Sequence, residues 1–270
     1  MNVTRIGGPT VLVELDGWRI LVDPTFDAPG RRYSFGLGTS SVKTRGPSVP
    51  VDELGEIDVI LVSHDHHADN LDDAGRALLP GARHVVTTVS GAGRLGLPNA
   101  HGLATGDTIL LEAPGREPIR VGATPCRHGP PLSRRLVGDV IGFTVRRQSR
   151  AHFDLWATGD TVLTRRLRRT ARHMTVDVAI VNGGGVQFGI TGPVRYSMTG
   201  TDAAKLIAAL EPAIAIPAHY DGWSHFRDGE AGMRTAIATA PAAVRDRVRW
   251  LPDGEPVDLG ESLDPQKTAP

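Results

Sequence analysis

A cluster of histidines and carboxylates that directly follows an apolar run is the feature that most constrains how this chain can fold. The run from Ile57 to Val62 predicts a buried β-strand, and the segment from Asp72 to Leu79 predicts the helix after it. Between them, Ser63 to Asp72 places three imidazoles within four positions, beside several carboxylates. Because neutral imidazole and carboxylate together suit zinc, manganese or iron, the segment predicts a metal site rather than a polar turn that happens to be rich in histidine.

Three more candidate ligands follow predicted strands elsewhere in the chain. His128 comes after the run 119–124, Asp160 after the run 153–157, and His219 after the run 213–218. A single histidine at such a place is more often a hydrogen-bonded structural residue, but here four loops that end strands all carry His or Asp. Since one edge of a sheet can bring such positions together, we expect them to form a single constellation.

This set resembles that of the metallo-β-lactamase superfamily, and most of all the branch that contains L-ascorbate-6-phosphate lactonase and N-acyl-phosphatidylethanolamine phospholipase D. The family's pattern is a His-x-His-x-Asp-His motif, a distal His, a Gly-Asp pair and a last His. The matching residues here are His64, His66, Asp69, His128, Asp160 and His219. The segment from Ile20 to Pro24 is also similar to the family's second strand and its Asp-Pro turn. The resemblance runs from about Val3 to Asp258 and implies an α/β fold, the four-layer αββα sandwich.

The same resemblance implies a metal-dependent hydrolase that uses a metal-bound hydroxide on a small-molecule lactone, phosphodiester or related ester. The cofactors would be one or two divalent ions, zinc or manganese, with Asp160 as the bridge. His64, His66 and His128 would bind one ion, and Asp69 and His219 the other. Asp69 is also expected to be catalytic, because a carboxylate near the nucleophile can orient it or receive its proton.

Two departures from the family's pattern concern the ligands. The first motif is one residue longer between its second His and its Asp, so either His66 or His67 could occupy the second-His position. His66 is favoured, because alternate residues that leave a strand point to the same side. Asn70 stands where the family has a His for the second metal, and an amide oxygen is a weaker ligand for zinc than imidazole. We therefore expect a second site that is weak, empty, or filled by a harder ion such as manganese.

Two further functional classes stay open. The scaffold can hold iron, which would make the chain an iron-dependent oxidoreductase, and Asn70 is compatible with a metal-binding protein without catalysis. His225, shortly after His219, is expected as a second catalytic residue that stabilises an oxyanion or grips a phosphate. The alternative for His225 is a hydrogen-bonded turn.

Length and composition agree with a single enzyme domain over residues 1–270. The 30 basic and 30 acidic residues give a formal net charge of zero, so we do not expect nucleic acid as a partner. The one cysteine, Cys126, cannot form an intramolecular disulfide, which favours a reducing compartment. No apolar N-terminal signal and no run of membrane-spanning length occurs, so we expect a cytoplasmic protein without membrane insertion. A homo-oligomer is compatible with this composition.

The remaining pattern predicts a run of strands and then mixed helices and strands. Thr10 to Leu15 and Trp18 to Val22 predict a hairpin about Asp16-Gly17. Further strands are expected at 84–89, 108–111, 140–145 and 178–181, and helices at 162–172, 201–210 and 229–239.

The segment from Phe26 to Pro50 is expected to be a long irregular loop. Its cations are Arg31, Arg32, Lys43 and Arg45, against the single acid Asp27. This excess of positive charge predicts either a lid over an anionic substrate or a mobile solvated loop.

Overall fold

The computed structural model of this chain describes residues 1–36, 38–131, 133, 138–260 and 263. Its strands are β1 (Asn2–Gly7), β2 (Thr10–Leu15), β3 (Trp18–Val22), β4 (Arg32–Gly36), β5 (Thr39–Val42), β6 (Val59–Leu61), β7 (His84–Thr88), β8 (Ala100–Leu103), β9 (Thr108–Leu111), β10 (Ile119–Pro125), β11 (Ile141–Arg147), β12 (Phe153–Ala157), β13 (Val176–Asn182), β14 (Ile214–Ala218) and β15 (Pro256–Asp258). Its α-helices are α1 (Asp73–Leu78), α2 (Val89–Leu95), α4 (Arg165–Arg172), α5 (Gly200–Leu210), α6 (Gly229–Ala238) and α7 (Ala242–Arg245). Short 3₁₀ helices are η1 (Val51–Glu53), η2 (Leu79–Gly81) and η3 (Gly189–Thr191). Among these described residues, no helix has the length and apolar character needed to cross a membrane.

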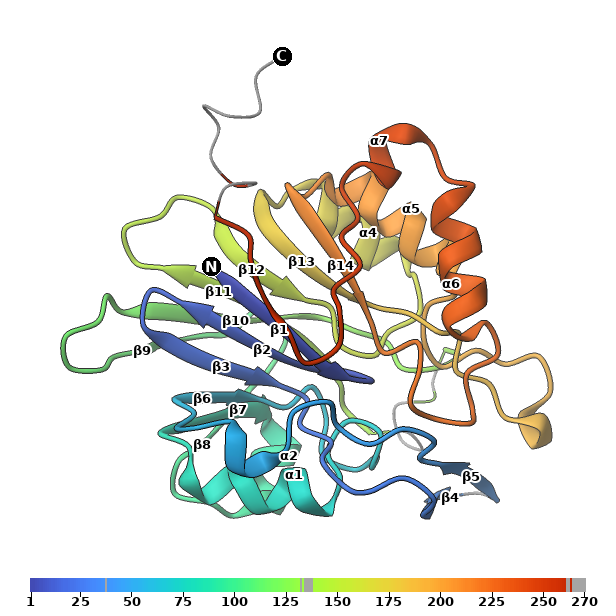
Figure 1. The fold of residues 1–270 in the computed structure, drawn as a ribbon, viewed down its shortest axis with the longest axis horizontal. Coiled ribbons are helices and arrows are strands. Elements are labelled where there is room, and N and C mark those ends of the chain that lie inside the picture. The colour runs from blue at the N-terminus through green and yellow to red at the C-terminus, as the bar shows by residue number, and fades with distance from the viewer. Residues whose placement is uncertain (37, 132, 134–137, 261–262, 264–270) are drawn as a thin grey trace.

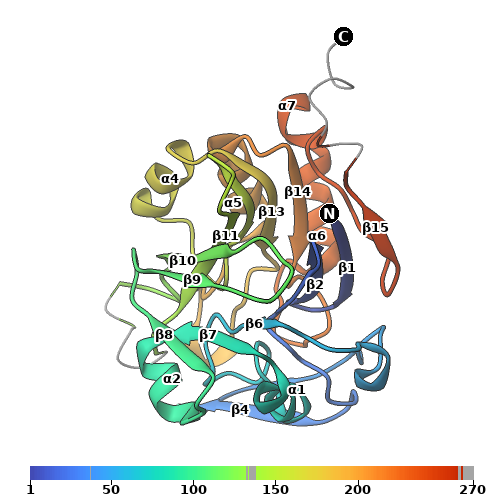
Figure 2. The ribbon, with the colours of Figure 1, turned by 90° about the vertical axis from the view of Figure 1, so that its left-hand side faces the viewer.

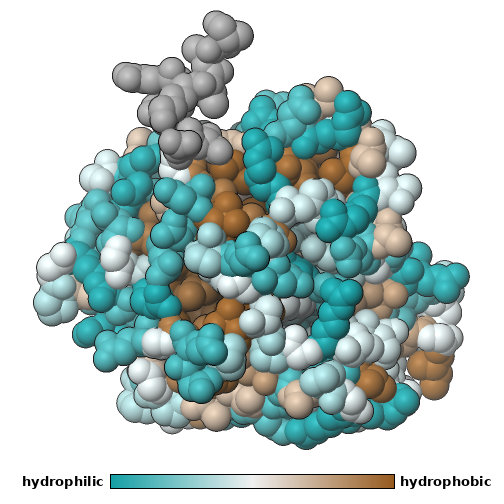
Figure 3. Space-filling model, viewed as in Figure 1, coloured by the Kyte–Doolittle hydropathy of each residue, from teal (hydrophilic) through white to brown (hydrophobic). Residues whose placement is uncertain are grey.

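Two large sheets form the centre of the molecule. One has the strand order β15-β1-β2-β3-β6-β7-β8, and the other has the order β14-β13-β12-β11-β10-β9. The helices α1 and α2 lie beyond the first sheet, and α4 to α7 lie on the far side of the second sheet (Figures 1 and 2). Viewed from the same side, the surface is mostly hydrophilic, with apolar residues in smaller patches between the polar ones (Figure 3).

Alternation of side chains along the strands gives the molecule one inner core and two outer cores. Leu155 of β12 packs in the core between the sheets, whereas the next residue, Trp156, packs under the helices of the second sheet. In the first sheet, Leu61 faces the inner core and its neighbour Ile60 faces the core beneath α1. Because successive side chains of a strand point to opposite faces, both sheets are buried on both sides. The predicted four-layer αββα sandwich is therefore confirmed.

The predicted hairpin between β2 and β3 is also present, and its turn has the expected chemistry. Asp16 and Gly17 adopt φ angles of 50° and 82°. Two successive residues with positive φ are what a two-residue hairpin turn requires, and Asp-Gly is a favoured pair for it. Neither β1 nor α2 was predicted from the sequence, and the structure has both in the first half of the chain.

The prediction of an irregular loop over Phe26 to Pro50 is wrong in its central part. Residues of this segment form the two-stranded sheet of β4 and β5, which we call the β4–β5 hairpin. Two long-range contacts hold it: Lys43 Nζ lies 2.7 Å from Asp72 Oδ2, and the Tyr33 ring lies 5.2 Å from that of Trp223. A window of local sequence contains neither partner, which is why the periodicity alone predicted a loop.

Both large sheets have runs of parallel strands whose carboxyl ends meet. In the first sheet β3, β6 and β7 are parallel, and in the second β12, β13 and β14 are parallel. The segments that follow β6, β12 and β14 carry His64, Asp160 and His219. The fold thus gathers side chains from both sheets at one place.

Candidate metal centre

The backbone at the ends of β12 and β14 is shaped to turn side chains into this meeting place. His219 adopts a φ of 52°, a left-handed conformation that is uncommon for a residue other than glycine. Its N–H donates to the carbonyl of Gly8 at 2.8 Å, which ties the end of β14 to the first sheet. Gly159, just before Asp160, has a φ of 62°, and a Cβ there would lie 2.7 Å from the carbonyl oxygen of Ile141. Only glycine fits at that point of the loop.

The first group of candidate ligands is made of imidazoles and one carboxylate. Ligand atoms of His64, His66 and His67 lie within 4.8 Å of one another, and so do those of His64, His128 and Asp160. His64 Nε2 is 3.2 Å from His67 Nδ1. All of these side chains are buried except that of His66, which is 21% exposed.

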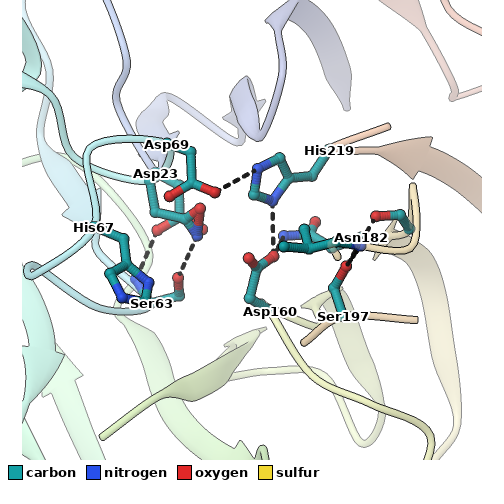
Figure 4. A network of polar contacts seen from close by, with 12 residues as sticks. Asp23, Ser63, His67, Asp69, Asp160, Asn182, Ser197 and His219 are labelled. Carbon is teal, nitrogen blue, oxygen red and sulfur yellow. Dashed lines mark hydrogen bonds and ion pairs between the residues drawn. The ribbon is translucent and has the colours of Figure 1, made fainter. Parts of the chain in front are cut away.

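The second group consists of Asp69, His219 and His225, whose ligand atoms again lie within 4.8 Å of one another. His219 lies between two carboxylates: its Nδ1 is 2.7 Å from Asp160 Oδ1, and its Nε2 is 3.6 Å from Asp69 Oδ2 (Figure 4). His225 Nε2 is 3.3 Å from the same Asp69 oxygen. The two groups are therefore adjacent, with Asp160 between them.

The structure brings together every ligand that the sequence predicted: His64, His66, Asp69, His128, Asp160 and His219. The choice between His66 and His67 is not decided by distance, because both rings lie near His64, with centroids 4.9 Å and 5.0 Å away. His67 is the more buried of the two and lies 5.2 Å from the ring of His128. The metal-binding roles of these residues stay predictions.

The sequence analysis did not predict the supporting roles of three residues, Asn182, Ser63 and Asp23. Asn182 Nδ2 donates to Asp160 Oδ1 at 3.1 Å, and the Ser63 N–H donates to Asp23 Oδ1 at 2.6 Å. Asp23 belongs to the Asp-Pro turn that the sequence had singled out, and Asn182 ends a strand, so position relative to strands was the available signal. Burial raises the pKa of Asp23 to about 8, although Ser63 donates to its carboxylate. This carboxyl group fixes the start of the His-rich segment, since Ser63 directly precedes His64.

A salt bridge fixes the other side of that segment. Asp65 accepts from Arg94 Nε at 2.9 Å and from Arg94 Nη2 at 2.5 Å, which anchors the segment to α2. Burial alone would raise the pKa of Asp65, but hydrogen bonds from Arg94 hold it well below its usual range. The carboxylate of Asp65 is thus committed to Arg94, and the imidazoles on either side of it are held in place.

Several buried polar atoms in the two groups have no hydrogen-bond partner among the described residues. They are Asp69 Oδ1, Asp160 Oδ2, His128 Nδ1, His219 Nε2, His225 Nδ1 and His225 Nε2. A buried polar group without a partner costs about 1–3 kcal/mol, and more when it is charged. So many unsatisfied donor and acceptor atoms converging on one place fit a divalent cation, because nitrogen and carboxylate oxygen are its ordinary ligands.

The protonation states agree with this fit. Burial lowers the pKa of His67 to about 3 and that of His225 to about 4, so both imidazoles are neutral at pH 7 and can donate a lone pair. Burial opposes ionisation of Asp69, but His219 and His225 outweigh it and lower the pKa of this carboxyl. His219 behaves oppositely: burial disfavours its charged form, yet Asp160 and Asp69 raise its pKa to about 10. Without a metal ion, Asp160 and Asp69 thus favour a proton on His219, whose positive charge stands in for that of a bound cation.

A pocket with aromatic walls opens beside both groups. It has about 450 Å³ of empty space including its mouth, and Phe35, Phe188 and Tyr196 line it together with His67, Asp69 and His128. The aromatic rings contact one another: Phe35 lies 5.9 Å from Phe188, and Phe188 lies 5.6 Å from Tyr196. Phe35 comes from the β4–β5 hairpin, so this hairpin covers the site.

The cations of the segment from Phe26 to Pro50, which contains the β4–β5 hairpin, are mostly paired with carboxylates. Lys43 is paired with Asp72. Arg31 Nη1 lies 2.5 Å from Asp73, and Arg45 Nη1 lies 3.1 Å from Asp221. The positive charge that suggested an anionic substrate is therefore largely neutralised within the protein.

Comparison with known proteins agrees with the fold and with the kind of site. A family model described as Beta-lactamase superfamily domain matches residues 18–220. The UPF0173 metal-dependent hydrolase of Caldivirga maquilingensis is 26% identical over 258 residues, which cover 94% of this chain and 96% of that protein.

Two solved structures share the fold over nearly the whole chain. Isothiocyanate hydrolase from Delia radicum gut bacteria superposes with a TM-score of 0.77 at 19% identity, covering 96% of this chain and 99% of that one. Igni18, a metallo hydrolase from Ignicoccus hospitalis, superposes with a TM-score of 0.68 at 19% identity, covering 95% and 97%. The finer resemblance to the lactonase and phospholipase branch stays a prediction.

Proposed function

The chain belongs to the beta-lactamase superfamily and is a metal-dependent hydrolase, and from this premise we propose that it cleaves a small lactone or related ester with an apolar substituent. One observation carries the proposal: Asp69 and His128, two residues with unsatisfied buried atoms, line a pocket whose other walls include three aromatic rings. The described residues that line this pocket include no lysine or arginine. A neutral ester suits such walls better than a charged phosphodiester does.

The residues divide between two ions as follows. His64, His66 and His128 would hold one ion, with His67 as the alternative to His66, and Asp69 and His219 would hold the other. Asp160 would lie between the ions. Zinc or manganese are the metals that this donor set favours. When bound, such an ion acts as a Lewis acid and lowers the pKa of water enough to supply hydroxide near neutral pH.

Asp69 is the residue that we propose as the proton acceptor. Its Oδ1 atom has no hydrogen-bond partner among the described residues, while Oδ2 faces His219 and His225. Because the neighbouring imidazoles keep the carboxyl ionised, Oδ1 can orient a water molecule and accept its proton. Phe35, Phe188 and Tyr196 would hold the apolar group of the substrate and exclude bulk water.

The test is a substrate panel on protein reconstituted separately with zinc, manganese and iron. The panel pairs phenyl with methyl members of four classes: lactones, carboxylic esters, phosphodiesters and isothiocyanates, the last being the class named for the structural neighbour. We expect turnover of lactones or esters with zinc or manganese, and a higher kcat/KM for the phenyl members.

Phe35→Ala probes the pocket directly. It should raise KM for the phenyl members by about tenfold, since burying an aromatic ring against such a wall is worth about 1.5–3 kcal/mol and Phe35 is one of three rings. KM for the methyl members should change little. Because the Phe35 ring also lies 5.7 Å from that of His225, metal content is measured on the same protein and should be unchanged. Leu110→Ala, on β9 away from the pocket, is the matched control. Turnover of phosphodiesters alone would overturn the substrate class, and oxygen consumption with iron would favour the oxidoreductase. No turnover with any metal would favour the metal-binding protein without catalysis.

A further inference from the structure

We propose that His225 is a protein ligand of the second metal ion, together with Asp69 and His219. This inference rests on the proposed metal dependence and not on the substrate. It assigns to His225 a different role from the one expected from the sequence, where it was a catalytic residue that contacts the substrate.

The first argument is the position of the His225 ring. Its Nε2 atom lies 3.3 Å from Asp69 Oδ2, and the same oxygen lies 3.6 Å from His219 Nε2. Two imidazole nitrogens and one carboxylate oxygen thus converge on one point, which is the donor set of many catalytic zinc sites.

The second argument is that the ring is buried and unsatisfied. The side chain of His225 is only 1% exposed, and neither ring nitrogen has a hydrogen-bond partner among the described residues. A buried imidazole that is neutral normally uses its N–H and its lone pair. A cation at the second group would satisfy the lone pair and would relieve the cost of burying it.

The third argument is that the protein fixes the ring in this orientation. The ring stacks on Trp223 with an interplanar angle of 18° and is flanked by Phe226 at 4.6 Å and Phe35 at 5.7 Å. The carbonyl of His225 accepts from the N–H of Gln187 at 3.1 Å. A metal ligand needs such preorganisation, whereas a simple turn residue does not.

Asn70, unlike His225, contacts residues of the first group of candidate ligands. Its Nδ2 lies 3.2 Å from Ser63 Oγ and 3.4 Å from His64 Nδ1, so its amide group lies against the first group of ligands. The sequence predicted a deficient second site because Asn70 stands in place of a histidine. His225 reaches the second group from another loop and would supply the imidazole that Asn70 does not.

The test measures metal binding and needs no substrate. Purified protein is stripped with a chelator, and zinc binding is then followed by competition with a chromogenic chelator and by elemental analysis after dialysis. Wild type should bind two ions per chain. His225→Ala should keep one ion and bind the second with a Kd raised by at least about tenfold, the scale on which even indirect partners of a metal ligand act.

Three further variants make the result specific. His173→Ala, an exposed histidine next to α4, is the matched control and should bind like wild type. His225→Gln keeps a side chain of similar size and should still lose the second ion, which separates loss of the ligand from loss of volume. Circular dichroism of both variants checks that each is folded. Asn70→Ala should keep both ions.

The proposal is overturned if His225→Ala and His225→Gln hold two ions with unchanged Kd. It is equally overturned if Asn70→Ala, and not the His225 variants, loses the second ion, or if wild type never binds more than one. The proposed ester hydrolysis fails separately. If wild type binds two ions and only the second depends on His225, but no ester is turned over, the assignment of His225 stands and the proposed ester substrate is refuted.

Discussion

Replacing Lys43 by methionine should destabilise the protein more than any exposed charge substitution, because Lys43 is half of a buried ion pair. Its Nζ lies 2.7 Å from Asp72 Oδ2, and the two side chains are 3% and 0% exposed. Methionine has a similar length and leaves the packing in place, so the perturbation is chiefly the loss of the positive charge. Burial lowers the pKa of Lys43 although Asp72 raises it, so the cost of burying the charge outweighs the attraction between the two groups. Each charge therefore needs the other in order to stay buried.

The size of the stability loss depends on the hydrogen bonds that the Asp72 carboxylate keeps after Lys43 is replaced. Removing one partner of a buried ion pair costs about 3–5 kcal/mol, because the other charge stays buried. The carboxylate of Asp72 still accepts from three backbone N–H groups, those of Phe26, Asp27 and Gly75, at 2.7–2.9 Å. These donors stabilise the remaining charge, so we expect a loss of about 3 kcal/mol, at the lower end of that range.

The assay is urea unfolding followed by circular dichroism, because Trp223 lies near Lys43 and would complicate fluorescence. Arg32→Met is the matched control, since the Arg32 side chain is exposed and, among the described residues, hydrogen-bonds Ser40 Oγ at 3.1 Å. It should change stability by less than about 0.5 kcal/mol. A loss below about 1 kcal/mol for Lys43→Met would refute the reasoning.

Two further predictions concern the site and the second sheet. Asp160→Ala should lower kcat by roughly 10³-fold or more and reduce metal content while leaving the circular dichroism spectrum unchanged; near-normal turnover would rule out its role between the ions. Gly142→Ala should cost about 1–3 kcal/mol in urea unfolding, because the added methyl would lie 2.5 Å from Thr124 Oγ1 and 2.6 Å from the carbonyl oxygen of Thr158; wild-type stability would show that these strands can move apart.

The metal-ligand candidates were predictable because their positions depend on local pattern and on one general rule. His64, Asp160 and His219 each follow an apolar run, and the carboxyl ends of parallel strands meet at one sheet edge. The four-layer arrangement followed from the family resemblance.

Other features depend on contacts between distant parts of the chain. The β4–β5 hairpin is held by Asp72 and Trp223, which lie outside its own segment. His225 follows the left-handed turn at His219, so no strand periodicity extends to it. The longer first motif places both His66 and His67 near His64, and spacing could not separate them.

The β4–β5 hairpin assigns attachment and recognition to different side chains. Lys43 and Tyr33 attach it to the body of the protein, whereas Phe35 faces the pocket. A substitution at Phe35 therefore changes the wall of the pocket without touching the ion pair that holds the hairpin. Under the proposed function, selection or engineering can vary the substrate at this one position while the ion pair keeps the hairpin attached, so specificity can change without a loss of stability.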